Sequence, residues 1–125
     1  LVSLQALASK LLMAREQESG LLRNVRQLIS DAFPQTLKLE DAARTLSLSP
    51  RTLQRRLKAL GTHFQQEMDD VRKSTAEDYL RYSRSHLTEI AYFLGYQEQS
   101  SFNHAFKAWT GMNPGEYRRK FGIQP

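Results

Sequence analysis

The sequence contains the same helical pattern twice, about 50 residues apart. Residues 39–58 read LEDAARTLSLSPRTLQRRLK, and residues 87–107 read LTEIAYFLGYQEQSSFNHAFK. Each copy has an alanine, an apolar residue three positions on, a short polar turn, and then a second segment with apolar residues at helical spacing. Two closely crossing helices require a small residue and a tight turn at these places. The duplication therefore predicts two helix-turn-helix units.

The turn of each unit has residues suited to a left-handed or a capping backbone. Gly95 stands four residues after Ala91, where glycine accepts a positive φ, whereas the first unit has Ser47 there and would carry about 1 kcal/mol of strain. Ser49 followed by Pro50 is typical of a helix cap with proline in the first turn. We expect a new helix to begin at this point.

The second helix of each unit, here called the reading helix, has one apolar and one polar face at about 100° per residue. The apolar stripes are Leu53, Leu57 and Leu60 in the first unit, and Phe102, Phe106 and Trp109 in the second. The polar faces carry Arg51, Thr52, Gln54, Arg55 and Lys58 in the first unit, and Ser100, Ser101, Asn103, His104 and Lys107 in the second. One such face alone is equally consistent with a solvated surface, but two in register favour recognition.

These side chains are of the types that read DNA bases. Arginine can donate two hydrogen bonds to guanine, and glutamine or asparagine can pair with adenine, each good pair giving about 1–3 kcal/mol of base discrimination. An α-helix also fits the major groove of B-form DNA. The two polar faces therefore predict two helices that contact bases in the major groove.

The charge of the chain favours a polyanionic partner. Its 125 residues include 18 lysines and arginines and 13 acids, a net charge of +5. Residues 49–62 contain Arg51, Arg55, Arg56 and Lys58 with no acid, whereas residues 88–113 are slightly negative. We expect the first reading helix to supply most of the electrostatic attraction, and the second mainly hydrogen bonds.

Several classes of protein are disfavoured by what the sequence lacks. It has no cysteine for disulfides or thiolate metal sites, and no apolar run near the roughly 20 residues that span a bilayer. His63, His86 and His104 show no metal-binding spacing, and there is no glycine-rich phosphate loop or serine-elbow motif. We expect surface or capping histidines, no cofactor, no metal ion, no membrane partner and no enzymatic activity.

The chain is expected to be all-α and to divide into four segments. Residues 1–20 form a connector helix from an upstream domain or, less favoured, a dimerising strand, and Gly20 is expected to end it. Residues 21–63 form the first unit, which opens with a packing helix ended by Pro34. Residues 64–84 form a linker helix, and residues 85–125 form the second unit.

The linker contains neither glycine nor proline over residues 64–83, and about 20 residues at 1.5 Å each give a rod near 30 Å. Successive major grooves on one face of DNA are about 34 Å apart. The apolar face of the linker helix is expected to contain Phe64, Met68, Val71, Thr75, Asp78 or Tyr79, and Tyr82. Its charges, including Glu67, are expected to be mostly solvated, with Arg72 and Lys73 as weaker phosphate candidates.

The end of the chain predicts one more helix. Asn113 can cap it and Pro114 fits its first turn. Tyr117 and Phe121 can then cover the second core. Residues 118–120 make a small basic cluster, which is equally consistent with a solubilising end and with a phosphate contact.

The segment EIAYFLGYQEQSSFNHAFKAWTGMNPGEYRR resembles the signature of AraC/XylS-type bacterial transcription regulators. The shared features are an Ile-Ala pair, a Gly-aromatic turn, a Phe-Lys pair and a closing Gly-x-x-Pro-x-x-Tyr-Arg, and the resemblance covers about residues 21–122. It implies seven helices, two helix-turn-helix subdomains joined by a long helix, and reading helices in adjacent major-groove segments. It also implies an upstream effector-binding domain and activation through RNA polymerase.

The resemblance, together with the helix faces, assigns roles to individual residues. The base-contacting positions are Arg51, Gln54, Arg55, Gln99, Ser100, Asn103 and His104. The phosphate-contacting candidates are Thr52, Arg56, Lys58, Ser101 and Lys107. His104 departs from the family pattern, which often has arginine there, and this weakens the expected guanine contact in the second half-site.

The predicted function is sequence-specific binding of double-stranded promoter DNA, regulating transcription in the bacterial cytoplasm at the nucleoid. The main alternative is a helical protein-binding adaptor, in which Arg51 and Arg55 would meet acidic partner surfaces. RNA binding is a less favoured alternative, because a helix cannot enter the narrow major groove of an A-form duplex.

Overall fold

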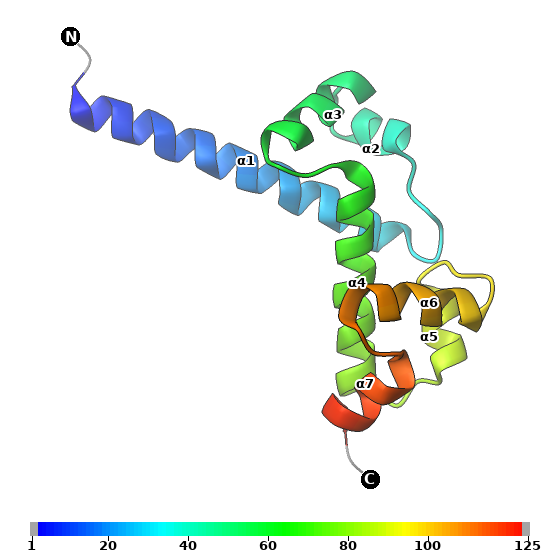
Figure 1. Ribbon diagram of the computed structural model, residues 1–125. Helices are drawn as coiled ribbons and strands as arrows, with labels where there is room; N and C mark the ends of the chain where they lie inside the picture. The colour runs from blue at the N-terminus through cyan, green and yellow to red at the C-terminus, as the bar shows by residue number, and fades with distance from the viewer. Residues whose placement is uncertain (1–2, 124–125) are drawn as a thin grey trace.

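A computed structural model describes residues 3–123, apart from the side chains of residues 16–19. Within this range the chain forms seven α-helices and no strand, which confirms the expected all-α fold. They are α1 (Leu4–Ala32), α2 (Leu39–Thr45), α3 (Pro50–Ala59), α4 (Phe64–Tyr82), α5 (Leu87–Phe93), α6 (Gln99–Thr110) and α7 (Pro114–Phe121). Helix α4 forms the axis: α2 and α3 lie near its beginning, and α5, α6 and α7 lie around its second half (Figure 1).

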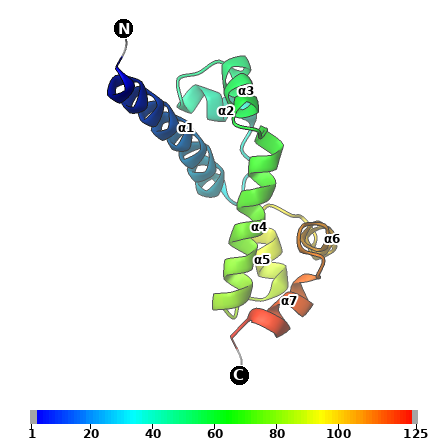
Figure 2. The same ribbon diagram turned by 60° about the vertical axis from the view of Figure 1, so that its left-hand side comes forward.

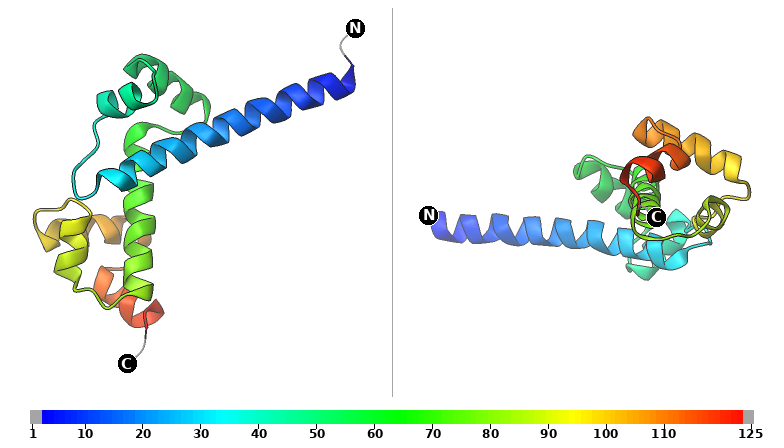
Figure 3. Two further views of the ribbon diagram at one scale, coloured as in Figure 1. Left: turned by 180° about the vertical axis from the view of Figure 1, so that it is seen from behind. Right: turned by 90° about the horizontal axis from the view of Figure 1, so that it is seen from below.

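Helix α1 runs unbroken through Gly20, so the expected separation of a connector helix from a packing helix is wrong. A glycine inside a helix costs only about 1 kcal/mol relative to alanine, and no atom from another part of the fold approaches within 4 Å of the Cβ position of Gly20. The last part of α1 packs through Val25 and Ile29, which are fully buried. Its first half projects away from the other helices, leaving Leu4 86% and Leu11 56% exposed (Figures 2 and 3).

The first unit closes around a core shared by α1, α2, α3 and α4. Its buried members are Val25, Ile29, Ala42, Ala43, Leu53, Leu57 and Met68. In the turn between α2 and α3, Leu48 N donates to Ala43 O at 2.9 Å, and Ser47 has φ 58°. The expected left-handed backbone at Ser47 is therefore confirmed.

The second unit repeats this construction around a more aromatic core. Its buried members are Ala76, Leu80, Ile90, Ala91, Leu94, Phe102, Phe106 and Tyr117. In the turn between α5 and α6, Tyr96 N donates to Ala91 O at 3.0 Å, and Gly95 has φ 96°. The hydrogen bond joins the same two positions as in the first unit, so the sequence repeat is a structural repeat.

Helix α4 uses two different faces, and the single apolar face expected from its sequence is wrong in its second half. Tyr82 is 71% exposed and Tyr79 is 36% exposed, whereas Ala76 and Leu80 are fully buried. Ala76 lies about 80° further around the helix than Met68, which faces the first core. The face changes because the second core lies on a different side of α4.

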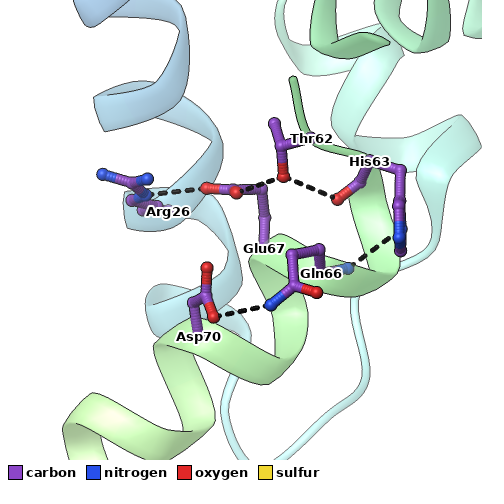
Figure 4. Close-up of polar contacts among 6 residues, drawn as sticks. All are labelled: Arg26, Thr62, His63, Gln66, Glu67 and Asp70. Carbon is purple, nitrogen blue, oxygen red and sulfur yellow. Dashed lines mark hydrogen bonds and ion pairs between the residues drawn. The ribbon is translucent and has the colours of Figure 1, made fainter. Parts of the chain in front are cut away.

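Glu67 is buried instead of solvated, with 2% of its side chain exposed. Arg26 Nε of α1 donates to Glu67 Oε1 at 2.7 Å, and Thr62 Oγ1 donates to Glu67 Oε2 at 2.7 Å (Figure 4). His63 caps the same helix, since its Nδ1 accepts from Gln66 N at 3.2 Å. The carboxylate therefore joins α1, α4 and the segment that follows α3.

Helix α7 fastens the second unit to the end of α4. As expected, Asn113 caps it by accepting from Glu116 N at 2.9 Å, and Pro114 lies in its first turn. Tyr117 is buried as expected, whereas Phe121 is 40% exposed and its ring centroid lies 4.7 Å from that of Tyr117. Burial raises the pKa of Tyr117, whose hydroxyl donates to Glu77 and accepts from Arg81.

Arg118 does not belong to a free basic cluster. Its guanidinium donates to four backbone carbonyls at the end of α4 and in the following loop: those of Tyr79, Leu80, Ser83 and Ser85, at 2.6–3.4 Å. Carbonyls in the last turn of a helix lack intrahelical partners, and a cation satisfies them well. The role of Arg118 is therefore structural.

Candidate DNA-binding surface

Helix α3 is held by its start and by its apolar face. Ser49 Oγ accepts from Thr52 N at 3.1 Å, and Pro50 occupies the first turn. Leu53 and Leu57 have no exposed surface. Because both the start and one face of the helix are fixed, the opposite face is presented to solvent in a defined orientation.

The polar face of α3 is exposed and free of partners. Arg51, Gln54, Arg55, Arg56 and Lys58 are all exposed. Within the described part of the chain, no hydrogen bond or ion pair holds these five side chains. Thr52 is half-buried, and its Oγ1 accepts from Ser49 Oγ at 2.8 Å, which leaves its own hydroxyl proton available. Helix α3 therefore presents four unneutralised positive charges within about two helical turns.

Helix α6 is positioned in the same way, by Phe102 and Phe106, which are fully buried. It ends at Gly111, whose φ is 81°, in the left-handed conformation that commonly ends helices. No side chain caps its first turn, so the amide groups there remain available. Its exposed polar residues are Ser100, Ser101, His104 and Lys107.

Two expected base-contacting residues of α6 are less accessible than the helical wheel suggests. Gln99 is half-buried, and its Oε1 accepts from Thr88 Oγ1 of α5 at 2.8 Å. Asn103 is also half-buried, and its Oδ1 is shielded from solvent with no hydrogen-bond partner among the described residues. Gln99 can reach an outside group through its Nε2 while it keeps Thr88, whereas Asn103 Oδ1 would need its amide to turn.

The structure places the two weaker phosphate candidates of α4 differently from the reading helices. Arg72 is half-buried, with its Cζ 5.5 Å from the centroid of the Tyr96 ring and its Nη2 3.3 Å from Thr36 Oγ1. Burial raises the pKa of Tyr96, and the positive charge of Arg72 partly opposes this shift. Arg72 thus contacts residues of both units, which the sequence pattern did not reveal. Lys73 is half-buried.

The histidines of the described residues do not form a metal-binding cluster. His63 caps α4, and His86 and His104 lie apart from it on the surface. No group of three or more histidine, aspartate or glutamate side chains within residues 3–15 and 20–123 comes close enough to hold a metal ion. None of the helices described is long and apolar enough to cross a membrane.

A pair of helix-turn-helix units, each exposing the polar face of its second helix, defines a tandem helix-turn-helix DNA-binding domain. Residues 42–120 match the family described as a helix-turn-helix domain. The chain belongs to the AraC-type family of helix-turn-helix transcription regulators, and its DNA-binding function follows from that membership. This family is one of DNA-binding regulators, not of enzymes.

Similar curated proteins are bacterial regulators. The chain is 44% identical over 108 residues to the ornithine utilization regulator of Pseudomonas aeruginosa, covering 86% of this chain and 32% of the relative. It is 40% identical over 84 residues to the regulator VirS of Mycobacterium tuberculosis, covering 67% of this chain and 25% of the relative. The chain therefore spans about a third of the length of such relatives.

Solved structures share the fold. The C-terminal domain of AraT, a response regulator from Geobacillus stearothermophilus, superposes with a TM-score of 0.72 at 36% identity, covering 83% of this chain and 88% of that one. The DNA-binding domain of AdpA, solved in complex with a target DNA, has a TM-score of 0.69 at 24% identity, covering 80% of this chain and 91% of that one. At 24% identity, the similarity to the AdpA domain shows only that the two chains share a fold.

Proposed function

We propose that the chain binds a promoter-proximal DNA site by placing α3 and α6 in successive major grooves on one face of the duplex. The observation that carries this proposal is the exposed face of α3, where four cations and one amide have no partner within the described residues. Side chains without internal partners break no intramolecular hydrogen bond when they meet phosphates and base edges, and each phosphate that a cation contacts releases counterions.

In this arrangement α3 supplies most of the affinity. Arg51, Gln54 and Arg55 contact base edges, where the planar arginine fork suits guanine and the glutamine amide suits adenine. Thr52, Arg56 and Lys58 contact phosphates on either side of the groove. The three arginines make this half of the site the more sensitive to base changes and to salt.

Helix α6 adds readout mainly by hydrogen bonds. Ser100 and His104 are exposed and free to contact bases, and Gln99 and Asn103 join them through their amides. Ser101 and Lys107 contact phosphates, as do the uncapped amides in the first turn of α6. The lack of arginine on this face makes the second half-site the weaker one.

Helix α4 sets the distance between the two reading helices. Its 19 residues span about 28 Å, which is close to the roughly 34 Å that separate successive major grooves on one face of the duplex. Residues 21–63 and 85–125 act as the two DNA-binding units in this proposal, with residues 64–84 as the spacer.

The intact protein extends this function. Residues 1–20 connect the DNA-binding region to an effector-binding domain upstream, and bound protein activates transcription through contact with RNA polymerase in the bacterial cytoplasm, where the nucleoid lies. One similar protein, 31% identical over 94 residues, is named a urease operon transcriptional activator in Escherichia coli, which supports activation.

Salt dependence separates this function from a protein-binding adaptor. With about 6–8 phosphate contacts, the logarithm of the association constant for a cognate duplex should fall steeply with log salt, at about −0.9 per phosphate. Arg56→Ala should reduce the slope by about one on every sequence. Arg15→Ala, on the projecting half of α1, is the matched control and should leave the slope unchanged. A slope near zero, or no preference among duplexes, would favour the adaptor.

A further inference from the structure

A second connection, in addition to α4, joins the two units. It consists of the loop after α1, represented by Phe33, Pro34 and Thr36, and the end of α5 with its turn, represented by Phe93, Gly95 and Tyr96, with Arg72 of α4 between them. We call this set the clasp. None of its members lies on the polar faces of α3 and α6.

Arg72 is the centre of the clasp. Its guanidinium Cζ lies 5.5 Å from the centroid of the Tyr96 ring in the second unit, and its Nη2 lies 3.3 Å from Thr36 Oγ1 in the first. Its Nε is enclosed without a hydrogen-bond partner among the described residues. An arginine held with one donor unsatisfied contributes little to stability, so its position is better explained by what it joins.

Gly95 brings the two units into direct backbone contact. A Cβ at this position would lie 2.9 Å from Pro34 O, 3.7 Å from Thr36 Oγ1 and 3.9 Å from Arg72 Nη2. The φ of 96° at Gly95 itself favours glycine more strongly than the φ of 58° that Ser47 adopts at the same place in the first unit. A second requirement at Gly95 is the close approach of the loop after α1.

Phe33 adds an apolar contact between the loop after α1 and the second unit. It packs against both hydrophobic cores, and its ring centroid lies 5.6 Å from that of Phe93. The loop after α1 is therefore attached to the second unit by a ring contact, by a backbone approach and through Arg72. Packed side chains of this kind allow discrete arrangements and resist continuous deformation.

We infer that Arg72 and Gly95 are positioning residues that fix α6 relative to α3 and thereby determine which spacing of the two half-sites the protein accepts. This inference rests on the proposed function of α3 and α6. A single helix can bend and twist, whereas two connections remove that freedom. Reading helices that are already held in place bind a matched site tightly, because they need not be ordered on binding. Because they cannot shift, they also bind a site with a different spacing poorly.

The test is a set of duplexes with the preferred site of the 125-residue chain and with one base pair added or removed between the half-sites. Each added pair turns one half-site by about 36° relative to the other. Arg72→Met removes the cation with little change of volume, and Arg72→Lys restores the charge without the planar fork. Lys73→Met is the matched control, because it removes a neighbouring cation of α4 that is outside the clasp. Gly95→Ala tests the backbone approach.

The wild-type chain should lose about tenfold in affinity when one base pair is added, and Arg72→Met and Gly95→Ala should lose only about threefold. Arg72→Lys should lie between them. Lys73→Met should weaken binding by one common factor on every duplex and keep the tenfold loss. A duplex with only the first half-site should bind wild type and Arg72→Met equally, which shows that the variant is folded.

Other results would overturn the inference. A spacing penalty in Arg72→Met and Gly95→Ala equal to that of wild type would show that α4 alone sets the register. Loss of binding to the single half-site would show that Arg72 supports the fold of the first unit. Failure of the wild-type chain to bind any duplex would instead overturn the proposed function, and this inference with it.

Discussion

Replacement of Arg26 by methionine should destabilise the protein more than replacement of Glu67, although the two residues form one ion pair. The side chain of Arg26 is 50% exposed and that of Glu67 is 2% exposed. Without Arg26, a carboxylate remains in the interior, and among the described residues the Thr62 hydroxyl is its one remaining partner. Without Glu67, the remaining guanidinium can turn to water. The more costly deletion is therefore the one that leaves the buried charge behind.

The expected magnitudes follow from this asymmetry. Removing one partner of a buried pair costs about 3–5 kcal/mol, and the half-exposed Arg26 places this pair at or below the low end, at about 2–3 kcal/mol for Arg26→Met. Glu67→Met loses charge-assisted hydrogen bonds but also relieves the desolvation of a carboxylate, so about 1 kcal/mol is expected. The double variant should be about as stable as Glu67→Met.

Urea denaturation followed by far-ultraviolet circular dichroism measures these free energies of unfolding. Arg23→Met, an exposed residue on the same helix, is the control and should change stability by no more than about 0.5 kcal/mol. If Glu67→Met were as destabilising as Arg26→Met, or more so, the buried carboxylate would be a net source of stability and the reasoning would be wrong.

Three further substitutions test the two reading helices and the turn of the first unit. Arg55→Ala should weaken binding to the preferred site by about 1–3 kcal/mol and relax base preference locally in competition assays, while equal weakening on every sequence would make Arg55 a phosphate contact. His104→Ala should cost less than Arg55→Ala in the same assay, and an equal loss would contradict the weaker role of α6. Ser47→Gly should raise the free energy of unfolding by about 0.5 kcal/mol, because it relieves a φ of 58°; a lower melting temperature would contradict this.

Features that depend on a few adjacent residues could be predicted from the sequence. The starts of α3 and α7 follow from Ser49 with Pro50 and from Asn113 with Pro114, because a side-chain cap and a proline act within one turn. The resemblance of the second unit to a known signature predicted the tandem fold and the family, and both are confirmed. The roles of individual side chains on α3 and α6 stay predictions.

Features that depend on distant residues could not be predicted. Glu67 is buried because Arg26, 41 residues earlier, is brought beside it by the crossing of α1 and α4. The second face of α4 depends on where the second core packs, so Tyr82 is exposed where the helical period placed it inside. The φ of Gly95 could be anticipated from its place in the turn, but the approach of Pro34 O to the space where a Cβ would lie exists only in the folded chain.

Selection of bound duplexes from a random pool tests whether two reading helices contact one face of DNA. Each bound sequence reports which base pairs are recognised and how far apart they lie. We expect two clusters of preferred bases about 10 base pairs apart, with the stronger preference in the cluster contacted by α3. A single cluster, or two clusters at variable spacing, would contradict this expectation.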